Sequence, residues 1–142
     1  MIRKLLFILL LFTVNVSLAT TFYVKPTWNG TGDGSSWANA SADLQAMIDT
    51  AATGDEIWVA MGTYYPTESF SNGSTIFSDK TFHYNDNVDI KIYGGFAGTE
   101  TMLSQRDITT NQTILSADVS GDDVANDFTS NRSDNNYHVM WV

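Results

Sequence analysis

The chain has no cysteine among its 142 residues, and basic residues are scarce. Without cysteine it can form neither a disulfide framework nor a reactive thiolate, and it offers no N-terminal cysteine for a lipid anchor. The folded chain must therefore be held together by buried apolar area and hydrogen bonds alone.

The shortage of basic residues gives the chain a strongly negative charge. Sixteen acidic residues stand against seven basic ones, and the formal net charge is −9. Two of the seven, Arg3 and Lys4, lie in a leader that is predicted to be removed, so the mature chain is more acidic still. Nucleic acids and anionic membrane surfaces would be repelled by such a field, and we expect neither as a partner.

The first 19 residues have the pattern of a secretory signal peptide. The basic pair precedes the apolar run Leu5–Val14, and Ser17-Leu18-Ala19 supplies small residues at positions −3 and −1 of a signal-peptidase site. The apolar run is shorter than the roughly 20 residues that a spanning helix needs, which argues against an uncleaved membrane anchor. We expect cleavage of residues 1–19, no transmembrane segment afterwards, and one secreted or cell-surface domain at 20–142.

The stretch from Ser41 to Pro66 joins an amphipathic helix to a strand. Apolar side chains recur with helical spacing, and Gly54 suits a helix end. Ser41 is expected to be the N-cap, with Asp43 in the first turn near the positive end of the helix dipole. A helix and a strand alone cannot cover each other's apolar faces, so we interpret the helix, Asp43–Thr53, as a lid on a longer stack. The apolar stripe consists of Leu44, Met47, Ile48, Ala51 and Ala52.

Period-two alternation follows the helix and recurs along the chain. Between Glu56 and Met61 the odd-numbered residues are predicted to face the core and the even-numbered residues to face away from it. From Val88 to Ile92 every second residue is predicted to face the core, and Gly94-Gly95 to turn the backbone. The other predicted strands are Thr21–Lys25, Thr113–Ala117 and Tyr137–Val142.

The spacing of these strands favours a solenoid. Ile92, Leu115 and Met140 follow one another at intervals of about 24 residues, a length typical of repeats whose coils stack parallel strands on their neighbours. The stretch Thr67–Lys80 is a polar insertion that lengthens the preceding interval. A small antiparallel sandwich is the alternative, but the connections are too long for tight hairpins.

Three segments of the chain, 21–66, 90–107 and 111–123, resemble a known family. They contain the motifs SSWANA, GDEIWVAMGTY and YGGFAGTET. Together they are similar to the N-terminal region of secreted right-handed parallel β-helix proteins of the pectin-lyase-like superfamily. The similarity is closest to bacterial cell-surface members described as polymorphic-membrane-protein-like or choice-of-anchor proteins.

The resemblance implies an all-β fold, a right-handed parallel β-helix whose N-terminal end is capped by the predicted helix. Members of the family are usually several hundred residues longer and often finish with a C-terminal sorting or anchoring domain. Residues 20–142 are therefore expected to form the cap and first coils of a longer β-helix domain, truncated at the C-terminus.

The resemblance also implies an exported surface protein that acts as a scaffold, an adhesin or a glycan-contacting module. Its expected partners are polysaccharides or host and cell-surface glycans. The open edges of the last coil are expected to allow self-association of the isolated fragment. The alternative function is the N-terminal part of a polysaccharide lyase or glycoside hydrolase whose catalytic coils lie beyond residue 142.

One acidic loop is a candidate for metal chemistry, because uronate lyases of this fold bind Ca²⁺ with carboxylates beside an arginine or lysine base. The loop has no EF-hand spacing, and a solvated acidic turn is the other interpretation. We assign no metal to it from the sequence. Its candidate residues are Asp118, Asp122, Asp123, Asp127 and Arg132.

The remaining candidate groups have structural interpretations. The glycines Gly30, Gly32 and Gly34 have the wrong spacing for a phosphate-binding turn. Arg106 is expected to form an ion pair that stabilises a bend. The sequence thus identifies no catalytic, cofactor-binding or metal-binding residue. Other polar and aromatic residues without a supporting motif are His83, His138, Ser35, Ser36, Ser116, Trp28, Trp37, Trp58 and Trp141.

Overall fold

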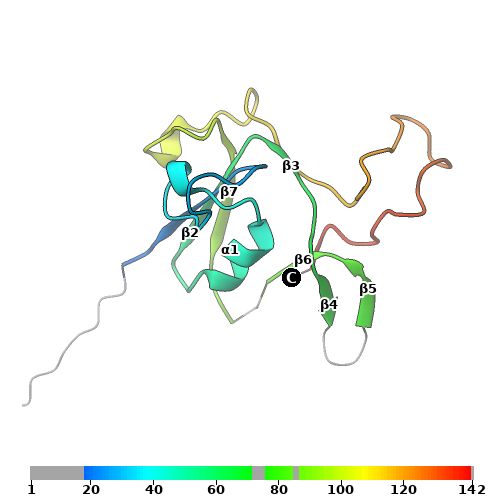
Figure 1. Ribbon diagram of the computed structural model, residues 1–142, viewed down its shortest axis with the longest axis horizontal. Helices are drawn as coiled ribbons and strands as arrows, with labels where there is room; N and C mark the ends of the chain where they lie inside the picture. Colours follow the sequence, from blue (N-terminus) through cyan, green and yellow to red (C-terminus); the bar gives the residue numbers. More distant parts are fainter. Residues whose placement is uncertain (1–17, 72–75, 85–86, 142) are drawn as a thin grey trace, which may run out of the picture.

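A computed structural model describes residues 18–71, 76–84 and 87–141 (Figure 1). Most of the predicted leader, residues 1–17, lies outside this range. The elements in chain order are β1 (Thr21–Val24), η1 (Trp37–Asn39), α1 (Leu44–Thr50), β2 (Glu56–Ala60), β3 (Gly62–Tyr64), β4 (Ser69–Ser71), β5 (Ile76–Lys80), β6 (Phe82–His83), β7 (Lys91–Phe96), η2 (Leu103–Gln105), β8 (Thr113–Leu115) and β9 (Met140–Trp141).

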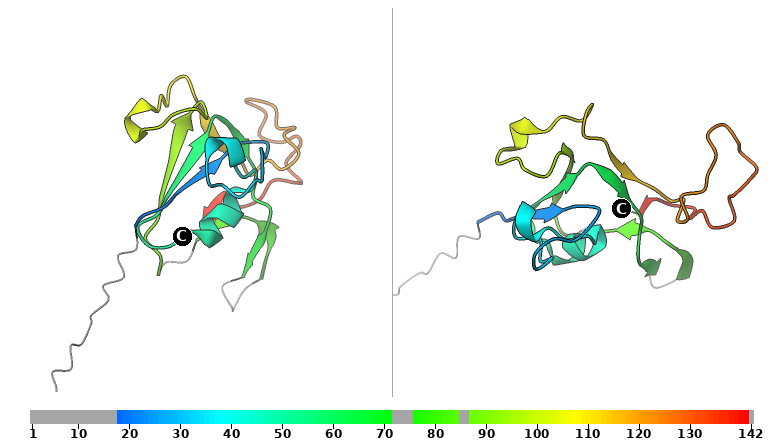
Figure 2. Two further views of the ribbon diagram at one scale, coloured as in Figure 1. Left: turned by 60° about the vertical axis from the view of Figure 1, so that its left-hand side comes forward. Right: turned by 45° about the horizontal axis from the view of Figure 1, so that its top comes forward.

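Within the described residues, three of the four sheets are parallel. Strands β1, β2 and β7 form a three-stranded parallel sheet, β3 pairs with β8, and β6 pairs with β9. The chain thus passes through the same three sheets twice in the same order, first as β2, β3 and β6 and then as β7, β8 and β9. Figure 2 shows this arrangement from two further directions.

The predicted repeat of about 24 residues is wrong as a stacking period. Ile92, Leu115 and Met140 lie in three different sheets, and each belongs to a strand that pairs with one from the first pass. Ile92 pairs with Ile57, for example. The interval measures the spacing between successive strands of one pass, because each pass contributes one strand to each of the three parallel sheets.

The polar insertion at 67–80 forms a strand pair of its own. Strands β4 and β5 pair in antiparallel fashion, with Ser69 opposite Lys80. Figure 1 shows this hairpin extending away from the parallel sheets. The insertion therefore lengthens the first pass without adding a strand to its ladders.

Strand alternation in the parallel sheet follows the prediction on the inner face only. Ile57 and Val59 are buried in the core, as predicted, but Trp58 and Ala60 on the opposite face are buried too. Trp58 stacks on Phe96, with ring centroids 4.7 Å apart and an interplanar angle of 9°. Met61, predicted to face the core, lies beyond the strand and is 49% exposed.

Strand β7 begins later and runs further than predicted. Ile90 and Ile92 pack against the core while Asp89 and Lys91 are exposed, as predicted, but Val88, also predicted to face the core, is half-buried and is not among the residues packed against it. The backbone does not turn at Gly94-Gly95, because β7 continues through both glycines, opposite a register shift in β2. Gly95 has φ +93°, and a Cβ there would lie 2.8 Å from Ile108 Cγ2, so this irregularity requires glycine.

The last predicted strand is shorter than expected. β9 contains only Met140 and Trp141, whereas the alternation predicted a strand from Tyr137. Tyr137 instead ends a long loop and is 89% exposed. Val142 lies outside the described residues.

Helix α1 covers one end of the interior, as the apolar stripe predicts. Leu44, Met47, Ile48 and Ala51 join the core formed by residues of β1, β2, β3 and β6. The helix ends at Thr50, three residues earlier than predicted, and Ala52 is exposed beyond it.

The helix N-cap is Asp43 rather than Ser41. The Asp43 carboxylate accepts a hydrogen bond from Ala46 N at 3.1 Å. Ser41 Oγ accepts one from Asp43 N at 3.1 Å, so it supports the capping residue from outside the helix. An aspartate satisfies the unpaired amide groups of a first turn as well as a serine does, which is why the sequence pattern did not distinguish them.

Gln45 connects the helix to the edge of β6. This side chain is fully buried, its Nε2 donates to His83 O at 2.9 Å, and its Oε1 accepts from His83 N at 3.0 Å. On the other side of the strand, Phe82 N donates to Val139 O, next to β9. Since alternate peptide groups of a strand point to opposite sides, the Gln45 amide occupies the place that a neighbouring strand would take.

Replacement of this amide should destabilise the fold. We expect Gln45→Met, which keeps the length of the side chain but loses both bonds to His83, to lower the free energy of unfolding by about 1–3 kcal/mol. Urea denaturation measures the change. Asp49→Ala removes only the other acceptor of Gln45 Nε2 on an exposed helix face, so it should stay within about 0.5 kcal/mol. Equal effects of the two substitutions would contradict a role for Gln45 as a strand substitute.

The parallel pairing of β3 with β8 can be tested by a disulfide, because the chain has no cysteine of its own. Thr63 and Ile114 are paired residues in adjacent strands, and paired Cα atoms in a sheet lie about 5 Å apart, within disulfide range. We expect the double variant Thr63→Cys/Ile114→Cys to oxidise to an intramolecular disulfide, detected by a mobility shift without reductant. Thr63→Cys/Gln112→Cys, with the second cysteine two residues before Ile114 and just ahead of β8, should remain reduced.

Candidate functional site

The loop between β8 and β9, residues 116–139, contains the candidate site, and we call it the acidic loop. It folds back on itself through a bridge between Asp118 and Asn135 and a hydrogen bond from Asn136 N to Ala117 O at 3.0 Å. Ser116 N donates to Tyr64 O at 2.9 Å, which fixes the start of the loop to β3. Figure 1 shows the loop, in orange and red, reaching out from the parallel sheets.

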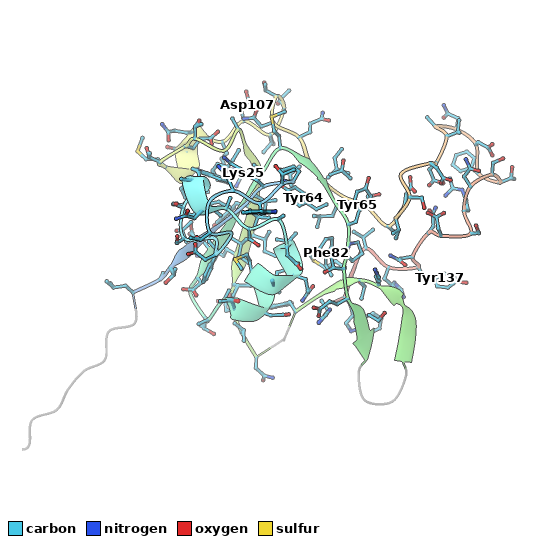
Figure 3. All side chains as sticks on the ribbon, in the orientation of Figure 1. Lys25, Tyr64, Tyr65, Phe82, Asp107 and Tyr137 are labelled. Carbon is cyan, nitrogen blue, oxygen red and sulfur yellow. The ribbon has the colours of Figure 1, made fainter. Side chains whose placement is uncertain are left out.

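The far side of the loop is also held by the first pass of the chain. Asn136 Oδ1 accepts a hydrogen bond from Lys80 N at 3.3 Å. Gly121, with φ +68°, lies close to the Tyr65 hydroxyl, so that a Cβ on Gly121 would be 3.3 Å from that oxygen. Figure 3 shows Tyr65 beside the root of the loop. Contacts at both ends give the loop a defined shape on the surface.

The loop divides the candidate acidic residues among three places. Asp118 and Asp122 come together with Asp134, and one carboxylate oxygen from each of the three lies within 4.8 Å of the other two. Asp123 forms an ion pair with Arg132 instead, with Oδ2 and Nη1 3.6 Å apart.

Asp127 does not join either group. Its Oδ1 accepts hydrogen bonds from Thr129 N at 2.9 Å and Ser130 N at 3.1 Å, within its own turn. Asp134 was not predicted as a site residue, because only the folding back of the loop brings it to Asp118. No spacing motif marks Asp134, since it enters the cluster from the returning half of the loop.

The surroundings shift the pKa values of two of the clustered carboxylates in opposite directions. Desolvation raises the pKa of Asp122, and the negative charges of Asp134 and Asp118 raise it further. Hydrogen bonding to Ser120, whose N–H donates to Oδ2 at 2.9 Å, lowers the pKa of Asp134. Hydrogen bonds from Thr129 and Ser130 likewise lower the pKa of Asp127.

Both carboxylate oxygens of Asp118 accept hydrogen bonds from the backbone of the loop. Asp118 Oδ1 accepts from Gly121 N at 2.7 Å and from Asp122 N at 3.2 Å, and Asp118 Oδ2 accepts from Asp123 N at 3.1 Å. Carboxylate oxygens are the ligands that Ca²⁺ prefers, but these oxygens already serve to shape the turn. We therefore describe Asp118 as an organiser of the loop and assign no metal to the cluster.

A cavity of about 540 Å³ lies beneath the loop, between the end of β8 and the returning chain. Three buried side-chain atoms in the described ranges have no hydrogen-bond partner, namely Asp123 Oδ1, Asn135 Oδ1 and Asn136 Nδ2. All three belong to residues that line this cavity. The lining also includes Asp118, Arg132 and Tyr137.

Arg106 does not form the predicted ion pair. Its guanidinium lies over the ring of Tyr93, with Cζ 5.2 Å from the ring centroid, and it makes no ion pair with Glu100 or Asp107. The Glu100 carboxylate instead accepts from the N–H groups of residues 97–99. Although partial desolvation opposes it, this set of bonds lowers the pKa of Glu100, so backbone amides replace the expected cation.

The other sequence candidates have structural contacts. Ser36 caps η1 by accepting from Asn39 N, and Ser116 accepts from Asp118 N. His83 Nδ1 lies 3.3 Å from Thr81 O, and the His138 ring meets Trp141 edge to face. These contacts bring no histidine to the acidic cluster. Further contacts of this kind join Ser35 to Asn39, Trp37 Nε1 to Glu100 O, Trp58 Nε1 to Glu56 and Gly34 O to Tyr23 N.

Comparisons with protein-family models, with curated proteins and with solved structures found no match. Within residues 18–71, 76–84 and 87–141, no helix combines the length and the apolar character needed to cross a membrane.

The pKa of Asp122 is raised and that of Asp127 is lowered, so substitution of each by asparagine should change the melting temperature in opposite directions. Because Asp122 has a raised pKa, its ionised form is unfavourable in the folded chain, and Asp122→Asn should raise the melting temperature at pH 7. This gain should vanish below pH about 4, the ordinary pKa of aspartate, where the wild-type group is protonated in both states.

Asp127→Asn is the matched comparison. The lowered pKa means that ionised Asp127 stabilises the folded chain above pH about 4, so the amide should lower the melting temperature at pH 7. That loss should start to shrink as the pH falls below about 4, where the unfolded chain begins to take up the proton, and should go on shrinking towards the lowered folded-state pKa. Thermal melts of both variants between pH 3 and pH 7 measure the two trends, and shifts of the same sign would contradict the described electrostatics.

Proposed function

We propose that the chain is an exported cell-surface protein with a right-handed parallel β-helix fold, which acts as a scaffold, adhesin or glycan-contacting module. The observation that carries this proposal is the double passage of the chain through three parallel sheets in one order. Stacking of successive passes in this way is what a β-helix requires. Connections between parallel strands are right-handed in about 98% of known cases, which supports the proposed hand.

The pairing of the strands favours this architecture over the small antiparallel sandwich. Every strand that contributes to the buried core belongs to a parallel ladder. Among the strands of the described ranges, the one antiparallel pair, β4 with β5, lies in the insertion. A sandwich would need antiparallel partners around the core itself.

The surface role is supported by two long segments that extend from the parallel sheets. Binding residues commonly lie on loops that a rigid scaffold positions, and two long excursions leave the passes here, the β4–β5 hairpin and the acidic loop. The negative charge of the chain suits exposure to water and disfavours nucleic acid. We propose a polysaccharide or a cell-surface glycan as the partner.

The edges of the second pass support a further part of this proposal. Strands β7, β8 and β9 each stand at the end of their sheet, so one side of each ladder is open to another strand. Self-association of the isolated 20–142 segment through these edges is what we expect.

A polysaccharide lyase or hydrolase is the weaker proposal. The clustered carboxylates lie on a projecting loop, and the oxygens of Asp118 are bound to the loop backbone. General acid and base groups need oxygens that can reach a substrate proton. The scaffold and glycan-contacting role therefore fits the described residues better.

Expression of the gene with its leader in a bacterial host tests the proposal. We expect intact-mass and N-terminal analysis of the exported protein to show a chain that begins at Thr20, and external protease to remove it from intact cells. A chain that keeps Met1 inside the cell would overturn the surface role. Release of reducing ends from polygalacturonate, absent with a buffer control, would favour the enzymatic alternative instead.

A further inference from the structure

We propose that the cavity beneath the acidic loop binds an uncharged saccharide unit. This inference rests on the proposed glycan-contacting function and gives it a site and a ligand class. Its starting point is the coincidence of a cavity of about 540 Å³ with three polar groups that lack partners, all contributed by residues of its lining.

The three atoms without partners would be satisfied by a ligand that both donates and accepts hydrogen bonds. Asp123 Oδ1 and Asn135 Oδ1 are acceptors, whereas Asn136 Nδ2 is a donor. Buried polar groups in native proteins are almost always satisfied by protein, water or ligand. A sugar hydroxyl is both donor and acceptor, so a small adjustment of the loop around one ring can satisfy the whole set.

The hydrogen bonds around these groups fix their orientation. Asn135 Nδ2 donates to Asp123 Oδ2 at 2.9 Å, which leaves Asn135 Oδ1 as the group to be satisfied. Asn136 Oδ1 accepts from Lys80 N, which leaves Nδ2. The polarity of the lining is therefore set by the fold, and it is mixed rather than purely acidic.

The charges around the cavity select a neutral ligand. The carboxylates of Asp118 and Asp123 line it, and those of Asp122 and Asp134 lie next to Asp118, so a uronate, sulfate or phosphate would be repelled. A metal cation would be repelled by the guanidinium of Arg132, which already pairs with Asp123, with Nη1 and Oδ2 3.6 Å apart. An uncharged ring with many hydroxyls avoids both penalties.

Tyr137 supplies the apolar part of the site. It belongs to the lining and is 89% exposed, so its ring is accessible to a ligand (Figure 3). Tyrosine presents a flat apolar face with a polar tip, which suits the C–H face of a pyranose with hydroxyls at its rim. The contacts of the loop with Tyr64, Tyr65 and Lys80 hold the cavity in place before a ligand arrives.

Titration of the exported chain by NMR tests this site. The probes are maltotriose, mannotriose and chitotriose as neutral sugars, trigalacturonate as the anionic sugar, and calcium chloride alone. We expect saturable binding of at least one neutral trisaccharide, with weaker binding of trigalacturonate and no displacement of Arg132 by Ca²⁺. The shifted resonances should include the side-chain amides of Asn135 and Asn136.

Substitutions at Tyr137 separate the ring from its hydroxyl. Tyr137→Ala should weaken binding roughly fivefold or more, the equivalent of one lost aromatic contact, while Tyr137→Phe should stay within about twofold of the wild type. Trp28→Ala is the control, because Trp28 is also an exposed aromatic residue, at 69%, but does not line the cavity. Tyr137 is exposed, so its truncation should leave the melting temperature unchanged.

The outcomes distinguish the site from the function. Neutral-sugar binding that survives Tyr137→Ala would overturn this site and leave the glycan-contacting role standing on another surface. Preferential binding of trigalacturonate, or a response to calcium alone at the same residues, would overturn the neutral ligand class. Wild-type protein that reaches the cell surface but binds none of the sugars would overturn the glycan-contacting role and the site together, leaving a scaffold.

Discussion

The fold depends most on the two hydrogen bonds between the side-chain amide of Gln45 and the backbone of His83. Strands of two or three residues are too short to be stable by themselves, so the β3–β8 and β6–β9 ladders need support from their neighbours. A glutamine amide carries the same donor and acceptor as a peptide group, and it ends the sheet without adding a strand. Leu44 and Ile48 of the same helix close the apolar interior beside it. One helix therefore satisfies both the polar edge and the apolar end of the stack.

Sequence reasoning predicted the features that depend on local periodicity. The helical stripe from Leu44 and the inward side chains Ile57 and Ile92 were found because neighbours in sequence decide them. The predicted pairing partners, strands about 24 residues apart, were wrong, since the true partners come from more distant parts of the chain and the passes differ in length. The burial of Trp58 was missed for the same reason, because Tyr23 and Phe96 pack against its ring from remote segments.

The candidate site was predicted only in outline. Proximity in sequence grouped Asp118 with Asp122 correctly but also included Asp127, which bonds to its own turn. Asp134 joins the cluster, and the cavity forms, only because the loop folds back on itself. No local sequence pattern predicts this fold-back. Tyr137 was placed in a strand because its neighbours alternate. Its position just before β9 leaves the ring on the surface.

The direction of the strand pairing has a consequence for how the chain acquires its structure. Every strand of the second pass pairs with one that precedes it by a long stretch of sequence, as Gly62 does with Thr113. Closing such long loops costs entropy before any contact compensates for it, and folding through distant contacts is slow. During synthesis the first pass, with its helix already attached, is complete before its partners emerge. It can then act as a template, so that the order of translation becomes the order of assembly.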